Sequence, residues 1–376
     1  MTENDDTVLI VGGGPAGMAA AIALSRAGLR CEIVELAPDA RPGGVGIALQ
    51  SAPLRATMAL GLYDRILAVG RPHRTIDMVR ADGTPVAELP QVNVNGPEDP
   101  PFVGMARETL HELMADEVHR LGVPVRLGTT IAASTPADDH VDVELTDGTR
   151  GRWSWIVAAD GLHSTTRARL LPGAPDPQYS GQSIWRAEAA CPERLEHYTM
   201  MIGGPLRLGL VPLPGGRLYL WLLDALVGPE RPPRDRMLGM FLERLAAFGG
   251  FAPEIAAGFD DVAQVDFRAL QWLVVPPPWH AGRTLLIGDA VHGTTPHLAY
   301  GAGLALEDAV VLGELAGQGL AFEELAARLA ERRFARARRI VEASLQLSRW
   351  EQEPGPPNPE AGALTAATMA STAEPI

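Results

Sequence analysis

Residues 7–35, TVLIVGGGPAGMAAAIALSRAGLRCEIVE, carry the pattern that decides the fold. The β-branched run Thr7–Val11 predicts a strand, the alanine-rich run Pro15–Ala27 predicts a helix that ends at Gly28, and Cys31–Glu35 predicts a second strand. A strand, a helix and a second strand in this order form a βαβ unit, which builds a parallel, twisted sheet. The sequence therefore predicts an α/β fold.

The uncharged run Thr7–Ser25 is about as long as a helix that spans a bilayer. Residues 12–15 (GGGP) divide it into a β-branched half and an alanine-rich half, which favours a strand, a turn and a helix. The chain starts with the acidic segment Met1–Asp6, whereas a secretory leader starts with basic residues. Cys31 and Cys191 are too few for a disulfide scaffold. We therefore expect a cytoplasmic protein without an integral membrane segment.

The composition is that of a folded protein and excludes several kinds of chemistry. The 376 residues are 46% hydrophobic and 21% charged, which is enough apolar material for a substantial core. All the basic residues are arginine, and this excludes a Schiff-base lysine, a Walker A lysine and a pyridoxal-phosphate anchor. The net charge of −14 disfavours a nucleic-acid partner, because a nucleic-acid-binding surface needs positive charge.

A glycine pattern, Gly12-x-Gly14-x-x-Gly17, joins the first predicted strand to the first predicted helix. Gly12 permits a tight turn, Gly14 lets a pyrophosphate approach the backbone, and Gly17 permits close packing of the helix on the strand. The phosphates would lie at the positive end of the helix. Glu35 ends the second strand, where a carboxylate can bind a ribose hydroxyl. The pattern predicts a bound dinucleotide, and NAD and FAD both fit it.

The rest of the chain divides into two kinds of pattern. Between residues 172 and 279, prolines cluster and the predicted strands are short, which indicates a second unit with a mostly antiparallel sheet. The patterns before and after this stretch predict helices over 107–121, 303–315 and 322–350 and strands over 125–131, 141–145, 153–158 and 283–287. The last helix carries a cluster of arginines that we expect to form a solvated face: Arg328, Arg332, Arg333, Arg336, Arg338 and Arg339.

Three further segments carry a resemblance to a known family. They are residues 41–50 (RPGGVGIALQ), an Asp-Gly motif at 159–167 (ADGLHSTTR) and a Gly-Asp motif at 288–303 (GDAVHGTTPHLAYGAG). In this order they resemble the single-component (group A) FAD-dependent aromatic monooxygenases, which have the p-hydroxybenzoate hydroxylase-like fold. Among these, the chain is most similar in character to salicylate, 3-hydroxybenzoate and urate hydroxylase-like members.

The resemblance implies a domain organisation. Residues 1–72, 104–172 and 281–353 would form a Rossmann-like FAD-binding domain, and residues 73–103 and 173–280 an inserted substrate domain. Residues 354–376 are rich in proline, alanine and threonine without periodicity, so we expect a flexible tail. We expect a monomer or a homodimer.

The resemblance also implies that FAD is bound and that NAD(P)H is a transient co-substrate. Asp289 would accept hydrogen bonds from the ribityl chain, and the amides of the glycines after Pro296 would face the flavin edge that becomes negative on reduction. Arg107 would lie near the phosphates, and Asp160 would serve both flavin and NAD(P)H or would cap the following helix. The cofactor residues are thus expected to be Gly12, Gly14, Gly17, Glu35, Arg41, Gly46, Arg107, Asp160, Asp289, Pro296, Gly301 and Gly303.

The activity implied by the resemblance is hydroxylation of a phenolic or heteroaromatic small molecule with dioxygen, through a flavin hydroperoxide. Arg186 is the expected partner of an anionic substrate, and Arg207 and Tyr219 are expected in the same pocket. His292, His297 and Tyr300 are, with Arg186, the catalytic candidates, because they are close in sequence to the Gly-Asp motif. His292 and His297 lack a third ligand at metal-binding spacing, so we expect no metal site.

Two other functions remain open. A flavin reductase or dehydrogenase of the same fold could act on a prenyl or polyketide intermediate. A non-enzymatic flavin-binding redox sensor could retain the fold and the cofactor.

Overall fold

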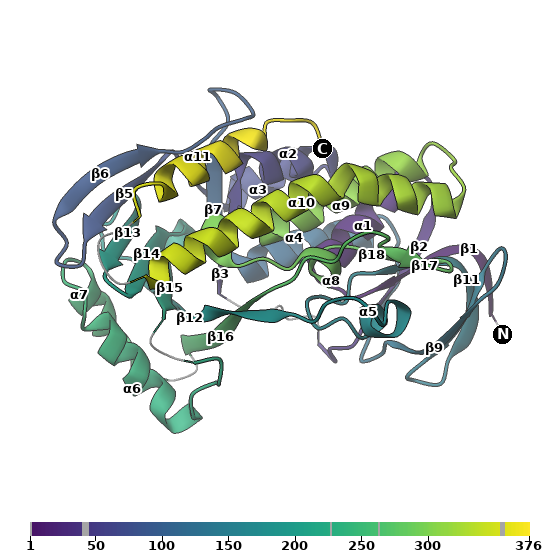
Figure 1. Ribbon diagram of the computed structural model, residues 1–376, viewed down its shortest axis with the longest axis horizontal. Coiled ribbons are helices and arrows are strands. Elements are labelled where there is room, and N and C mark those ends of the chain that lie inside the picture. Colours follow the sequence, from purple (N-terminus) through teal and green to yellow (C-terminus); the bar gives the residue numbers. More distant parts are fainter. Residues whose placement is uncertain (1, 40–44, 226–227, 262–263, 354–357) are drawn as a thin grey trace.

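The computed structural model describes residues 2–39, 45–225, 228–261, 264–353 and 358–376, and Arg41 therefore lies outside the described residues. Figure 1 shows two sheet-containing units side by side, with the long helix α10 running across both. Among the described residues, none of the helices combines the length and the apolarity needed to cross a bilayer.

The first unit is built on a sheet whose central strands are parallel. Its strands follow the order β17-β18-β11-β1-β2-β8. In addition, β10 pairs antiparallel with β11, and β9 pairs antiparallel with β10. The bounds are β1 Thr2–Val11, β2 Arg30–Glu35, β8 Val125–Leu127, β9 Ile131–Pro136, β10 Val141–Leu145, β11 Arg150–Ala158, β17 His280–Ala281 and β18 Thr284–Leu286. The strand, helix and strand predicted over residues 7–35 are therefore confirmed as the centre of a parallel sheet.

Helices cover this sheet, and α1 is packed on nearly all sides. Residues 17–24 of α1 are buried, since α9 and α4 both pack against it. A Cβ atom at Gly313 of α9 would lie 2.9 Å from the Cβ of Ala23, so small residues let the two helices approach closely. The alanine-rich pattern thus marks a buried helix. The helices of this unit are α1 Pro15–Arg26, α4 Arg107–Arg120, α5 Thr165–Leu170, α8 Asp289–His292, α9 Gly301–Ala316, α10 Phe322–Gln352 and the 3-10 turn η3 Pro296–Leu298.

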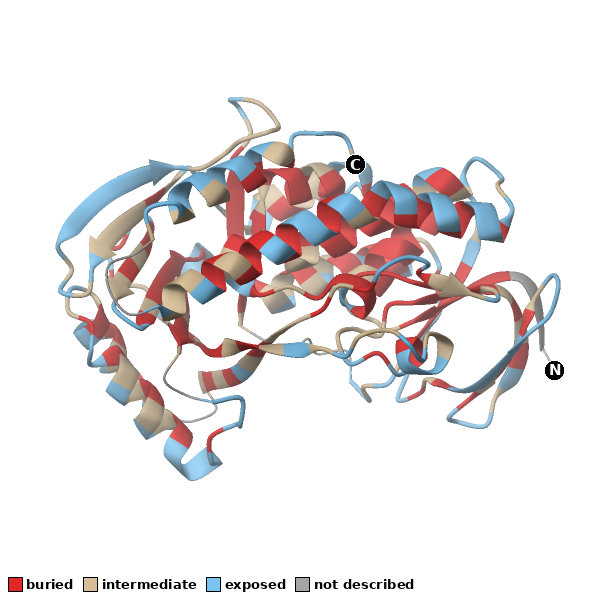
Figure 2. Ribbon diagram, viewed as in Figure 1, coloured by how far each residue is buried: buried red, intermediate tan, exposed pale blue. Residues whose placement is uncertain are grey.

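The second unit contains a sheet in the order β16-β12-β15-β14-β13-β5-β6, antiparallel except between β13 and β5. Leucines on one face of β14 and β15 form a buried cluster with side chains of α6 and α7. Figure 2 shows buried and exposed residues alternating along α6. The bounds are β5 Thr75–Arg80, β6 Pro85–Pro90, β12 Gln178–Ala190, β13 Tyr198–Gly203, β14 Leu206–Pro212, β15 Arg217–Asp224, β16 Val265–Trp272, α6 Arg234–Leu245, α7 Ala252–Ala256 and the 3-10 turn η1 Pro214–Gly216. The predicted fold, with a mostly antiparallel second sheet, is confirmed.

A small antiparallel sheet, β3-β7-β4, lies next to the second sheet: a Cβ at Gly46 of β3 would overlap the ring of Tyr219 of β15. The bounds are β3 Gly46–Gln50, β4 Arg71–His73, β7 Phe102–Ala106, α2 Ser51–Ala59 and α3 Tyr63–Val69. Helix α10 packs on α9 of the first unit and on β12 of the second, and thereby ties the two units together.

The expectation of a solvated arginine face on α10 is wrong for two residues. The side chain of Arg333 is fully buried and that of Arg336 nearly so, because α9 presents Glu307 and Asp308 to them. Arg333 Nε donates to Asp308 Oδ1 and Arg333 Nη2 to Glu307 Oε2, both at 2.8 Å. Paired carboxylates on the neighbouring helix are what make burial of these guanidinium groups possible.

The expectation of a flexible tail differs from the structure over α11, Ala361–Ser371. This helix packs on α10, and Met369 is buried there. The carbonyl oxygen of Thr372 accepts hydrogen bonds from Arg336 and from Arg55 of α2, at 3.0 Å each. The composition of the tail is low in bulky apolar residues, but these contacts to α10 and α2 order it.

Candidate active site

The glycine turn after β1 is shaped by close backbone contacts. Gly12 has φ +107°, and its N–H donates to Val34 O at 2.8 Å. A Cβ at Gly12 would lie 2.4 Å from Ala159 O, and one at Gly17 would lie 1.9 Å from Gly12 O. By contrast, a Cβ at Gly14 would meet no atom within 4 Å. Gly12 and Gly17 therefore serve packing, whereas Gly14 borders open space at the start of α1, where phosphates can approach the backbone.

Glu35 lies against this turn, at the end of β2. Its Oε2 accepts from the N–H of Gly13 at 2.6 Å, and its Oε1 accepts from the N–H of Ala37 at 2.7 Å. Two backbone amides thus fix the carboxylate next to the predicted phosphate position. An acceptor held there fits the ribose of a dinucleotide.

The Asp-Gly motif forms a capping arrangement at the start of α5. Asp160 accepts from the hydroxyl of Ser164 at 2.5 Å and from the N–H of Thr166 at 3.0 Å, while Ser164 Oγ accepts from the N–H of Arg167. Arg167 then donates to Ala290 O at 3.0 Å and so joins this motif to the Gly-Asp motif. Both carboxylate oxygens of Asp160 have partners within the turn, which favours the capping alternative.

The Gly-Asp loop follows β18 and packs on the start of α1. A Cβ at Gly288, which has φ +62°, would lie 2.9 Å from the Cβ of Ala16. The next residue, Asp289, is accessible to solvent, but protein atoms surround its carboxyl group closely. This desolvation raises the pKa of the carboxyl group, while the charges of His292 and Arg107 act to lower it. A carboxylate in this position can accept hydrogen bonds from hydroxyl groups of a bound cofactor.

Arg107 begins α4 and lies between the Gly-Asp loop and the second sheet. Its Nε is buried, and no protein acceptor reaches it within the described parts of the chain. Burial lowers the pKa of Arg107, and the charge of Arg186 lowers it further, while Asp289 acts in the opposite direction. A buried, unpaired N–H group needs an acceptor, and an anionic or carbonyl group of a cofactor would supply one.

The two glycines at the start of α9, just after η3, lie in different surroundings. A Cβ at Gly303 would lie 2.3 Å from Cγ of Pro53, so this glycine is required by the packing of α9 on α2. A Cβ at Gly301 would meet only a methyl group of Thr294, at 3.5 Å. Pro296 begins η3, directly before α9. The amides of the first turn of α9 near Gly301 have no partner within the helix, by helix geometry, and would suit a flavin edge that gains negative charge.

Three of the expected catalytic residues have partners inside the protein. Tyr300 is fully buried and donates to Glu307 Oε1 at 2.7 Å, and burial raises the pKa of its phenol. His292 is buried, with Nε2 2.6 Å from Asp308 Oδ2. His297 Nε2 lies 3.0 Å from the amide oxygen of Gln182, and its Nδ1 lies 3.0 Å from Thr295 Oγ1. Tyr300 and His292 thus belong to the ion cluster behind the Gly-Asp loop, whereas His297 lies between the two units.

The second sheet turns its other face toward the flavin-binding unit. Arg186 of β12 is paired in register with Trp221 of β15, and Trp221 is paired with Gly209 of β14. Arg186 donates to Asp266 Oδ2 through Nε at 3.1 Å and Nη2 at 2.5 Å. Burial raises the pKa of Tyr219, on the same face, and Arg186 and Arg107 oppose this shift. Arg107, Arg186 and Tyr219 therefore lie close enough for their charges to interact.

Several residues of this region were not singled out from the sequence. Asp308 accepts from Gly288 N–H at 2.9 Å and supports the Gly-Asp loop from behind. Asp266 pairs with Arg186 and also lies 3.4 Å from Arg268 Nε, and Glu351 near the end of α10 lies 2.8 Å from Arg207. No local motif marks these carboxylates, because their partners come from distant parts of the chain.

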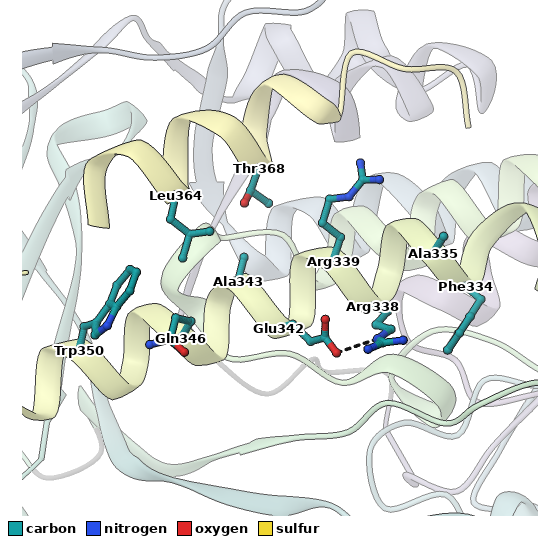
Figure 3. A pocket seen from close by; sticks show the side chains of 10 residues that line it. All are labelled: Phe334, Ala335, Arg338, Arg339, Glu342, Ala343, Gln346, Trp350, Leu364 and Thr368. Carbon is teal, nitrogen blue, oxygen red and sulfur yellow. Dashed lines mark hydrogen bonds and ion pairs between the residues drawn. The ribbon is translucent and has the colours of Figure 1, made fainter. Parts of the chain in front are cut away.

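Two negative findings delimit the site. Within the described ranges, no cluster of three or more histidine, cysteine, aspartate or glutamate side chains could hold a metal ion. A groove of about 650 Å³ lies between α10 and α11, but none of the residues lining it belongs to the motifs described above (Figure 3).

The residues present fit FAD at the glycine turn, at Glu35, at Arg107 and at the Gly-Asp loop.

Comparison with known proteins agrees with this geometry. The profile of the family described as "FAD binding domain" matches residues 5–183 and 270–344. Aurachin C monooxygenase/isomerase of Stigmatella aurantiaca is 30% identical, over 92% of this chain and 90% of the relative. A 2-heptyl-3-hydroxy-4(1H)-quinolone synthase of Pseudomonas aeruginosa is 32% identical, over 82% of this chain and 80% of the relative. The solved structure of Klebsiella pneumoniae HpxO with FAD and uric acid has a TM-score of 0.83 at 23% identity and covers 98% of this chain and 92% of that one.

Proposed function

The chain belongs to the FAD binding domain family of flavin monooxygenases, and from this premise we propose that it hydroxylates a phenolic or heteroaromatic small molecule, using NAD(P)H and dioxygen. The observation that carries the proposal is the convergence of the glycine turn, the Gly-Asp loop and Arg107 on the side of the first unit that meets the second sheet. FAD, when bound, supplies the redox and oxygen chemistry. The protein has to hold the cofactor, place the ring of the substrate and exclude water.

The first unit contains the groups that would hold FAD. The amides at the start of α1 beside Gly14 would bind the phosphates, and Glu35, fixed by two backbone amides, would bind a ribose hydroxyl. Asp289 would accept hydrogen bonds from the ribityl hydroxyls, and the buried Nε of Arg107 would find its acceptor on the cofactor. The amides near Gly301 would stabilise negative charge on the flavin edge.

The second sheet contains the groups that would receive the substrate. Tyr219 and Trp221 give this face an aromatic surface on which a ring can pack. The ring of Tyr219 lies against Gly46, so the small sheet closes one side of the region. Such closure matters because water diverts the reaction of reduced flavin and dioxygen to hydrogen peroxide.

The proposal is tested by loading the purified protein with FAD and measuring NADH and NADPH oxidation with a panel of phenols and nitrogen heteroaromatics. We expect at least one ligand to stimulate oxidation and to yield a product with one oxygen atom derived from ¹⁸O₂. Ligand-stimulated oxidation without oxygenated product would favour the reductase alternative. A protein that takes up no FAD would overturn the proposal.

A further inference from the structure

Arg207 of β14 lies on the face of the second sheet that is turned toward the flavin-binding unit. Leu206, Leu208 and Leu210 of the same strand belong to the core on the opposite side. Because side chains alternate along a strand, Arg207 shares its face with Gly209, over which the indole of Trp221 lies. The guanidinium of Arg207 is thus a cation at the proposed aromatic site.

Glu351, in the last turn of α10, holds this cation. Its Oε1 lies 2.8 Å from Arg207 Nη1, and its Oε2 lies 3.3 Å from His297 Nε2. The side chain amide of Gln182 donates to Oε2 at 3.5 Å. Burial acts to raise the pKa of Glu351, but His297 and Arg207 outweigh it and hold the pKa below its ordinary value. The carboxylate is therefore ionised and compensates the charge of Arg207.

Surrounding contacts hold this arrangement in place. Gln182 Oε1 accepts from the hydroxyl of Ser348, one turn before Glu351 on α10, at 2.6 Å. The same Gln182 oxygen lies 3.0 Å from His297 Nε2 in the loop before α9. Side chains from β12, β14, α10 and η3 thus meet at one carboxylate, and a long flexible glutamate is fixed there by its neighbours.

The second arginine of the same face is compensated in a similar way. Asp266 of the neighbouring strand accepts two hydrogen bonds from Arg186. A substrate carboxylate that approached Arg186 or Arg207 would have to displace a carboxylate of the protein and would lie close to it. Like charges brought together in a partly buried site disfavour binding by more than the lost hydrogen bond alone.

We propose that Glu351 is a specificity-determining residue, which neutralises Arg207 through their direct ion pair and thereby restricts the aromatic site to uncharged substrates. This inference rests on the proposed function, because it assumes that the face carrying Arg207 receives the aromatic ring. It assigns to the end of α10 a role in substrate choice that no motif of the chain indicates.

The test compares two ligands of nearly the same shape, 4-hydroxyquinoline-2-carboxylate and its carboxamide, in the FAD-loaded protein. Their dissociation constants are measured from changes in the flavin absorbance spectrum, without turnover. In Glu351→Gln, which frees Arg207, we expect the carboxylate to bind about tenfold more tightly, since a hydrogen bond between charged groups is gained. We expect the affinity for the carboxamide to change less than threefold. The matched control is Glu353→Gln, at an exposed position two residues further, which should alter neither affinity.

A second variant keeps the proposal falsifiable if Glu351→Gln does not fold. The double variant Arg207→Gln/Glu351→Gln removes both charges of the pair together and leaves no lone buried charge. Its affinity for the carboxylate should therefore stay within twofold of the wild type. A carboxylate that gains no affinity in Glu351→Gln, or loses tenfold in the double variant, overturns the proposal. Failure of the proposed function would instead appear as normal ligand binding without oxygenated product.

Discussion

The glycine turn and the substrate-facing sheet are built on opposite principles. In the turn from Gly12 to Gly17, two missing Cβ atoms allow backbone contacts that no other residue permits, one within the turn and one with Ala159. The sheet face depends on ion pairs between distant residues, Arg186 with Asp266 and Arg207 with Glu351. The comparison teaches that the glycine turn tolerates almost no change of shape, whereas the proposed substrate face depends on charges that a single substitution can alter.

The largest expected effect on cofactor binding belongs to Gly17→Ala. The new methyl group would lie 1.9 Å from the backbone oxygen of Gly12, so the turn must open. We expect the affinity for FAD to fall on the order of a hundredfold, measured by flavin fluorescence titration. The matched control is Gly239→Ala in α6, where a Cβ meets nothing within 4 Å and FAD binding should be unchanged. If Gly17→Ala keeps its FAD affinity within threefold, the claim that the glycine turn tolerates almost no added volume is wrong.

A second prediction concerns the support behind the Gly-Asp loop. Asp308→Asn would remove the buried anion that pairs with His292 and one of the two that pair with Arg333, and we expect the free energy of unfolding in urea to fall by about 3–5 kcal/mol. Glu342→Gln removes a carboxylate that forms an exposed ion pair with Arg338 on α10, and there the expected loss is below about 1 kcal/mol (Figure 3). Equal losses in the two variants would contradict the importance of the buried cluster.

The same carboxylate predicts a pH dependence. Burial acts to raise the pKa of Asp308, but His292 and Arg333 outweigh it and lower the pKa from 3.8 to about 2. The stabilisation is therefore present above the unfolded-state pKa and is lost as the pH falls from about 4 through about 2. The free energy of unfolding should decline in this window, and more steeply in the wild type than in Asp308→Asn. Parallel profiles for the two proteins would show that other groups cause the decline.

The smallest expected effect concerns the end of the chain. Truncation after Ser371 removes the carbonyl oxygens that accept from Arg336 and Arg55, and we expect a loss of about 1–2 kcal/mol. Glu374→Ala keeps the main-chain acceptors and is the matched control, for which thermal unfolding should be nearly unchanged. A truncated protein as stable as the full chain would mean that the tail only lies on the surface.

Much of the fold could be predicted because its signals are local. The strand at Val141–Leu145 has the predicted bounds, and α4 and α10 begin at the predicted residues. The burial of Arg333 could not be predicted, because the arginine run looks the same whether it faces water or the carboxylates of α9. For the same reason the sequence did not predict helix α11, since few of its residues are bulky and the contacts that hold it lie on α10.

The candidate site divides in the same way. Gly12 directly follows β1, Glu35 is the last residue of β2, and Asp289 comes three residues after the end of β18, so the strand pattern was enough to place all three at the ends of strands. Tyr300 and His292 are close to the Gly-Asp motif in sequence, but their side chains turn into the ion cluster. Closeness along the chain therefore did not indicate which side of the loop a side chain occupies.

The sequence by itself determined the βαβ core, the dinucleotide turn and the order of the motifs, because strand alternation, glycine conformation and helix amphipathicity act over a few residues. Only the tertiary structure decided which charges face one another: Asp308 with Arg333, Asp266 with Arg186, and Glu351 with Arg207. A charge has no preferred partner until the packing of distant elements sets the distances, and these distances decide which charges can be buried.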